Sequence, residues 1–129
     1  MELTIPDNFV YEIELKVEQK HTAAAYGSGL AEVFATPAMI ALMENAAYIG
    51  VEQFLPEGTS TVGMEVNVQH LKATLPNKVV KAVSTVKAVD GRKISFNIDV
   101  FEDNEIVGKA THTRFAIDSE RFIRKLREQ

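Results

Sequence analysis

Three residues, Glu44, His70 and Thr36, combine a residue type and a position that could support catalysis. Glu44 lies in the middle of the apolar stretch 36–55, where a carboxylate loses its hydration unless another group pairs with it. His70 ends an otherwise apolar strand face, and histidine titrates near neutral pH. Thr36 stands at a predicted helix start, whose free amides and positive potential suit a developing oxyanion. These residue types would suit a site that moves protons and stabilises an anion.

Each of the three residues also has an ordinary structural explanation. Glu44 could reach the rim of the fold or form a structural pair with a basic group. A lone histidine on an apolar face is more often a satisfied core residue than a catalyst. Thr36 could serve only as the N-cap of the helix. No single residue decides between a structural and a catalytic role.

The composition excludes several other kinds of site. The 129 residues include no cysteine, so disulfides, thiolate catalysis and zinc-thiolate sites are excluded. The three histidines lack the spacing of a metal motif, and no metal is expected. There is neither a Gly-rich phosphate loop nor a serine nucleophile elbow. A net charge of -4 argues against nucleic acid as the main partner.

The length and hydropathy of the chain indicate one domain, spanning residues 1–129, with a single core. The first residues, MELTIPDNFV, lack the basic and apolar regions of a signal peptide. No run approaches the roughly 18 apolar residues that are needed to span a bilayer. We therefore expect a cytoplasmic protein that does not enter a membrane.

The elements that must position these residues are predicted from hydrophobic periodicity. Residues 36–54 predict a long helix, with Thr36 as the N-cap and Pro37 at the first helical position. Apolar residues lie on nearly every side of this helix, which is typical of a buried element. Residues 21–35, broken by glycine and serine, predict a loop. Five strands are predicted over 9–20, 60–71, 78–90, 92–102 and 105–117, and a short tail helix capped by Ser119 follows them.

Side-chain alternation in the strands predicts which residues face the helix. On the strand 60–71 it places His70 on the helix side, together with Val62, Met64, Val66 and Val68. On the last strand it places His112 and Arg114 on a common face. Arg114 could there anchor an anionic group or stabilise a C-terminal carboxylate partner.

The order of the elements predicts an α+β fold. Short turns between the last four strands predict an antiparallel meander. One face of a curved sheet must be buried, and the long apolar helix is the only element that could cover it. The prediction is a hotdog fold, in which an antiparallel sheet wraps around a long central helix and a short C-terminal helix follows.

Four motifs together carry a family resemblance: V-F-A-T-P-A-M-I-A-L-M-E (33–44), the glycine of T-V-G-M-E-V (61–66), V-Q-H (68–70) and T-H-T-R (111–114). They resemble the fluoroacetyl-CoA thioesterase-like branch of the hotdog thioesterases. The spacings from Thr36 to Glu44 (44 − 36 = 8) and from Glu44 to His70 (70 − 44 = 26) match the threonine, glutamate and histidine of that family.

The resemblance implies hydrolysis of a short-chain acyl-CoA thioester, with Thr36, Glu44 and His70 as the catalytic set and no cofactor. It also implies that the Gly63 backbone lines the acyl pocket and that Arg114 contributes to the site or to ligand binding. Specialised fluoroacetyl-CoA members carry aromatic residues before V-F-A-T, whereas residues 23–30 here include one tyrosine and no phenylalanine. Fluoroacetyl selectivity is therefore not predicted.

A mechanism and an assembly follow as hypotheses. Glu44 would act as the base or the nucleophile, His70 would relay protons, and Thr36 would orient water or attack with help from His70. Eight helical residues rise about 12 Å, so Thr36 and Glu44 of one helix are too far apart for a hydrogen bond. If they serve one site, two antiparallel helices from two protomers supply them. We expect a homodimer with shared active sites, alone or within a higher oligomer.

Two alternatives to the thioesterase remain open. A hotdog hydratase acting on enoyl thioesters usually shows an Asp-x4-His pair in the helix region, and this chain lacks that pair. A non-catalytic acyl-CoA-binding dimer is the other alternative. The presence of all three polar residues at the matching spacings argues against it.

Overall fold

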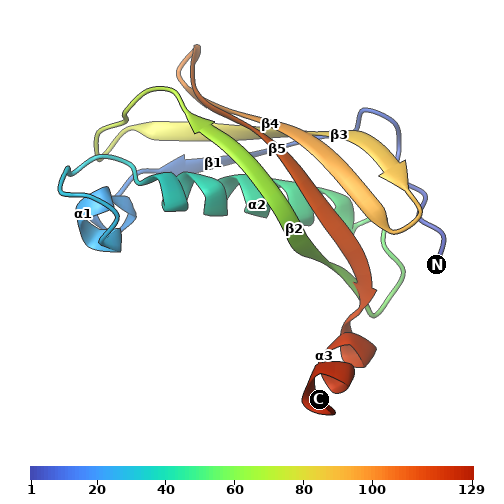
Figure 1. Ribbon diagram of the computed structural model, residues 1–129. Helices are drawn as coiled ribbons and strands as arrows, with labels where there is room; N and C mark the ends of the chain where they lie inside the picture. Colours follow the sequence, from blue (N-terminus) through green and yellow to red (C-terminus); the bar gives the residue numbers. More distant parts are fainter.

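Five antiparallel strands form one strongly curved sheet that lies over a long helix, as the computed structural model of residues 1–129 shows (Figure 1). Residues 21–35, predicted as a loop, contain short helical turns. The elements in chain order are β1 (Val10–Lys16), the 3-10 helix η1 (Gln19–His21), α1 (Ala23–Tyr26), α2 (Thr36–Glu52), β2 (Thr59–His70), β3 (Val79–Asp90), β4 (Lys93–Glu102), β5 (Glu105–Asp118) and α3 (Ser119–Arg127).

The strand order is β1-β3-β4-β5-β2, which corrects one prediction. Tight turns join β3, β4 and β5 into a meander, with Gly91 and Asp103 at positive φ. β2 pairs with β5 rather than with β3, so the predicted meander of four strands is wrong. The reason is the segment 71–78, which is too long for a hairpin turn and carries the chain across the sheet. β2 is consequently an edge strand with one unpaired side.

One face of α2 packs against the sheet and the opposite face is open in the single chain. Met39 and Met43 are fully buried, and each contributes about 1.5–3 kcal/mol by leaving water. Ala41 and Tyr48 lie on the exposed side of the helix. The prediction of a helix buried on every side is therefore wrong for one chain. The residues of α2 that face the core are Ala38, Met39, Leu42, Met43, Ala46, Ala47, Gly50 and Val51.

The helix termini differ from the prediction in ways that matter for the site. Ala35 is the N-cap of α2 and offers no side-chain cap, so Thr36 lies inside the first turn and its hydroxyl is free for another partner. α2 ends at Glu52, slightly before the predicted end. In α3, Asp118 rather than Ser119 is the cap, since its side chain accepts a hydrogen bond from the Arg121 amide.

A β-bulge in β2 corrects the predicted orientation of two side chains. The pairing with β5 shifts between Gly63 and Glu65, which leaves Met64 as the extra residue. Gly63 therefore lies on the helix side, against Glu44, whereas Val62 and Met64 line a pocket with the tail helix on the other side. Val68 packs against the core as predicted. No helix of the structure is long and apolar enough to cross a membrane.

Candidate active site

Thr36 and His70 form a hydroxyl–imidazole pair at the N-terminal end of α2. Thr36 Oγ1 lies 2.8 Å from His70 Nδ1, and the His70 ring meets the Phe34 ring edge-on at 6.3 Å. His70 Nε2 is buried and completes no hydrogen bond with the protein. Burial lowers the pKa of His70, an effect that the Lys72 backbone only partly opposes. The imidazole is neutral at neutral pH and can accept a proton from the hydroxyl or from water.

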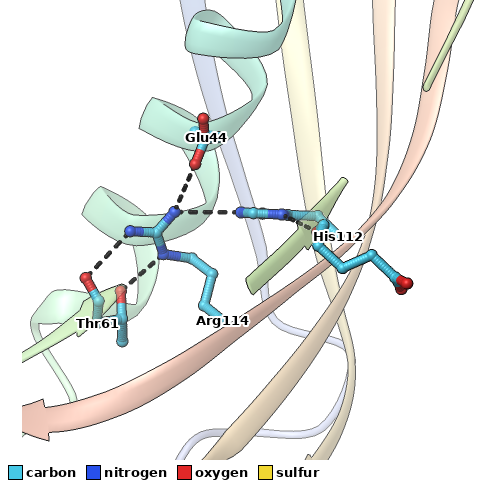
Figure 2. A network of polar contacts seen from close by, with 5 residues as sticks. Glu44, Thr61, His112 and Arg114 are labelled. Atoms are coloured by element: carbon cyan, nitrogen blue, oxygen red, sulfur yellow. Dashed lines mark hydrogen bonds and ion pairs between the residues drawn. The ribbon is translucent and has the colours of Figure 1, made fainter. Parts of the chain in front are cut away.

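Glu44 lies eight residues after Thr36 on α2, and its carboxylate is held by Arg114. Glu44 Oε2 accepts a hydrogen bond from Arg114 Nη1 at 3.2 Å (Figure 2). The Arg114 side chain is only 9% exposed, whereas that of Glu44 is 39% exposed. One side of the carboxylate is thus fixed and the other is open on the uncovered face of α2.

Arg114 is itself held from several directions. Its Nε donates to Thr61 Oγ1 at 2.8 Å and its Nη2 donates to the Thr61 carbonyl at 3.1 Å. The guanidinium lies 5.6 Å from the centre of the Tyr48 ring. Burial lowers the pKa of Arg114, and the neighbouring Glu44 opposes this shift. The guanidinium is therefore a fixed positive group beside the Glu44 carboxylate.

His112 completes this cluster from the middle of β5. Its Nε2 lies 3.2 Å from Arg114 Nη1, and its Nδ1 lies 2.8 Å from the Glu65 carbonyl oxygen (Figure 2). The ring stacks on Phe96, with centroids 5.8 Å apart. Burial is the main cause that lowers the pKa of His112. The predicted common face of His112 and Arg114 is confirmed by this contact.

Gly63 brings the β2 backbone against the Glu44 carboxylate. A Cβ atom at position 63 would lie 2.8 Å from Glu44 Oε2, closer than real Cβ contacts allow. It would also lie 3.4 Å from Arg114 Nη1. The absence of a side chain therefore allows the strand and the carboxylate to be adjacent.

Within one chain the predicted residues form two clusters. Thr36 and His70 make the first, beside a pocket of about 390 Å³. Glu44, Gly63 and Arg114 make the second, beside a pocket of about 270 Å³ that Arg114 lines. Eight positions along α2 correspond to about 12 Å of rise, and no hydrogen bond or ion pair joins the clusters. No group of three or more metal-ligating side chains is present.

Sequence reasoning missed Thr61 and Tyr48 as parts of the Glu44 cluster. Thr61 accepts two hydrogen bonds from Arg114, but simple alternation assigned it to the outer face because the bulge at Met64 was not anticipated. Tyr48 follows Glu44 by one helical turn, and this spacing was the available signal for its contact with Arg114.

Comparisons with known proteins agree on the family. A model of the fluoroacetyl-CoA-specific thioesterase family matches residues 17–120. The fluoroacetyl-CoA thioesterase of Streptantibioticus cattleyicolor is 33% identical over 98 residues, which cover 76% of this chain and 70% of the relative.

Solved structures extend the similarity to the fold. A structure of the fluoroacetyl-CoA thioesterase FlK matches with a TM-score of 0.91 and 26% identity, covering 98% of both chains. A thioesterase superfamily member from Thermus thermophilus matches with a TM-score of 0.87 and 25% identity, covering 97% of this chain and 95% of that one. The predicted hotdog fold and the predicted enzyme class, a thioesterase, are confirmed. The chain belongs to the fluoroacetyl-CoA-specific thioesterase family.

Proposed function

We propose that this protein hydrolyses a short-chain acyl-CoA thioester to the free acid and CoA, with Thr36, Glu44 and His70 as its catalytic set. The observation that carries the proposal is the 2.8 Å contact between the Thr36 hydroxyl and His70 Nδ1. A neutral imidazole in this position can take a proton from an attacking oxygen and return it to the leaving sulfur. The family relationship supports the reaction type.

The reaction adds water across the bond between the acyl carbon and sulfur. The C–S bond breaks, and the thiolate of CoA receives a proton that His70 relays. The positive end of α2 stabilises the oxyanion that forms on the carbonyl oxygen of the acyl group. In one route the carboxylate of Glu44 attacks the acyl carbon and forms an anhydride, and His70 takes the proton of the water that then hydrolyses this anhydride. In the other route Glu44 is the base that takes the proton of the attacking water. No cofactor takes part in either route.

Gly63 and Arg114 complete the proposed site as the acyl pocket. The Gly63 backbone lies against the Glu44 carboxylate, and residue 63 has no side chain that would cover the carboxylate. Arg114 offers a buried positive group next to the same carboxylate. A short acyl group bound beside these residues, on the open side of the carboxylate, would place its carbonyl carbon near Glu44. The relatives named for fluoroacetyl-CoA make that thioester one member of the panel to be assayed, together with acetyl-CoA.

The proposed site is completed by a second protomer. His70 of β2 lies over Thr36, and Gly63 of β2 lies over Glu44, so β2 and α2 run in opposite directions. A two-fold axis midway between these contacts would pass near Ile40 of α2 and the centre of β2. Such an axis brings the Thr36–His70 cluster of one protomer onto the Glu44–Gly63 cluster of the other.

The free edge of β2 provides the surface for this homodimer. Only β5 pairs with β2, so its second side carries unpaired backbone groups. Two β2 strands can pair in antiparallel fashion about a two-fold axis at Asn67. When the bulged Met64 is left out of this pairing, Gly63 of one protomer lies opposite His70 of the other. Both of these positions lie on the helix side of the sheet. The homodimer is therefore the smallest assembly in which the proposed catalytic set meets.

Release of free CoA from a panel of short-chain acyl-CoA thioesters tests the function. The wild-type protein should release CoA, and Glu44→Gln should lower kcat by about 100-fold or more with a smaller change in KM. Unchanged turnover in Glu44→Gln would contradict the role of this residue. Binding without release would instead identify an acyl-CoA-binding dimer, and consumption of an enoyl thioester without release would identify a hydratase.

We also propose the cytoplasm as the location of the protein, because CoA thioesters are intracellular metabolites. Fractionation of cells that produce the protein at its natural level would test this location.

A further inference from the structure

His112 is a buried titratable residue that the proposed reaction does not use. Only 2% of its surface is exposed, and both ring nitrogens have partners. We propose that His112 is a positioning residue, which holds the Arg114 guanidinium and through it the Glu44 carboxylate, while also fixing the bulge of β2. This inference rests on the proposed function, because it assigns a role in orienting the Glu44 carboxylate for that reaction.

The two partners of His112 determine its protonation state. The Glu65 carbonyl can only accept a hydrogen bond, so Nδ1 carries the proton. Arg114 can only donate, so Nε2 presents its lone pair to Nη1. The ring is thereby held as the neutral Nδ1–H tautomer. A second proton on Nε2 would place two N–H groups against each other and displace the guanidinium.

The surroundings of the ring favour this neutral form. Phe96 of β4 covers one ring face, and β2 contributes the Glu65 carbonyl and the uncharged Gly63 beside the ring. The charged groups facing the ring are Arg114 of β5 and Glu44 of α2. Burial and the positive charge of Arg114 lower the pKa of His112 more than Glu44 and the Glu65 carbonyl raise it.

The same ring connects the carboxylate to the bulge. Normal antiparallel pairing is interrupted between Gly63 and Glu65, and the Glu65 carbonyl accepts from the His112 ring. The bulge is what turns Gly63 toward Glu44. His112 therefore fixes both the guanidinium that holds the carboxylate and the backbone that lies against it. A displacement of about 1 Å at such a site is enough to lower the rate by about 100-fold.

Two substitutions separate the two hydrogen bonds of His112. His112→Gln places an acceptor where Nε2 lies and removes the Nδ1 donor. His112→Asn places a donor where Nδ1 lies and removes the acceptor for Arg114. We expect His112→Asn to lower kcat by about 10- to 100-fold with KM changed less than about threefold, because the acceptor for Arg114 is lost. His112→Gln should keep kcat within about threefold of the wild type, because it retains that acceptor and the backbone pairing of β2 with β5 on both sides of the bulge still holds the strand. His21→Asn is the control, since that histidine contacts Glu18 and not this cluster.

A purely structural role for His112 would give a different pattern. In that case the decrease in kcat of each variant would parallel its decrease in melting temperature, and His112→Gln would not be more active than His112→Asn. Wild-type kcat in His112→Asn would overturn the proposal. So would an equal loss of kcat in the two variants.

A spectroscopic measurement tests the proposal without activity. Nitrogen NMR of the imidazole groups in the wild-type dimer should show His112 protonated at Nδ1 and bare at Nε2 at neutral pH. A ring protonated at Nε2 would overturn the inference even if the enzyme is active. If the wild type released no CoA from any thioester while this tautomer was observed, the proposed function would fail and the hydrogen-bonding arrangement of His112 would stand.

Discussion

The hydroxyl of Thr36 lies 2.8 Å from Nδ1 of His70, at the first turn of α2. Because Ala35 occupies the N-cap position, this hydroxyl is not consumed by the helix terminus. Thr36→Ala should therefore lower kcat by about 10- to 100-fold while Thr36→Ser retains most of it. CoA release measures both variants. Equal kcat in Thr36→Ala and the wild type would show that the hydroxyl has no part in the reaction.

We expect that adding even a methyl group at position 63 lowers activity strongly. A Cβ atom at this position would lie 2.8 Å from Glu44 Oε2, so Gly63→Ala must displace the carboxylate or the strand. We expect a loss of kcat of about 10-fold or more with the fold retained. Circular dichroism would verify the fold, and Gly91→Ala serves as a control that strains a turn with no contact to the site. Full activity in Gly63→Ala would contradict the close approach.

The half-buried His70 and the buried His112 predict a loss of stability and activity on acidification. The pKa values of His70 and His112 are lowered from the ordinary 6.5, mainly by burial. As the pH falls below that value, the unfolded chain binds more protons at these rings than the folded chain does. The free energy of unfolding therefore decreases as the pH falls from about 6.5 through the folded pKa values.

Measurements of melting temperature and kcat across this pH range test whether stability and activity decrease on acidification. Both should fall on acidification, since a protonated His70 cannot take a proton from Thr36. The double variant His70→Asn with His112→Gln should show a shallower fall in melting temperature. A melting temperature that rises on acidification in the wild type would have the wrong sign for buried neutral histidines.

The long helix and the strands were predictable because their patterns are local. Apolar residues between Thr36 and Glu52 are dense enough to require burial, and strand alternation placed His112 beside Arg114. The bulge at Met64 was not predictable, since V-G-M-E-V continues the alternation that the backbone interrupts. The pairing of β2 with β5 depends on long-range packing of the segment 71–78, which no local pattern indicates.

The separation of Thr36 from Glu44 within one chain was predictable from helical rise alone. Thr36 and Glu44 are separated by about 12 Å along α2, and the structure shows them with different partners. The sequence does not indicate why the face of α2 that carries Glu44 is open. That face stays uncovered because the sheet curves over only one side of the helix.

The proposed shared site predicts complementation between two inactive variants. The double variant Thr36→Ala with His70→Ala lacks one cluster, and Glu44→Gln lacks the other. Random mixing gives about half mixed dimers, each with one intact site of two, so about a quarter of wild-type kcat should return. Refolding the two proteins together and assaying CoA release measures this recovery. A site built within one chain would recover nothing.

The proposed pairing of two β2 strands about Asn67 predicts a specific cross-link. The chain has no cysteine, so Asn67→Cys introduces the only thiol. Two such residues opposite each other across a two-fold axis would have Cα atoms about 4.5–5.5 Å apart, within the range for a disulfide. Oxidation should convert the protein to a covalent dimer, which a non-reducing gel would show.

Asn97→Cys is the matched control for this cross-link. Asn97 lines the same outer groove from β4, a strand that is flanked on both sides within its own sheet. Cross-linking of both variants at the same rate would indicate random collision, and no cross-linking of Asn67→Cys would refute this register.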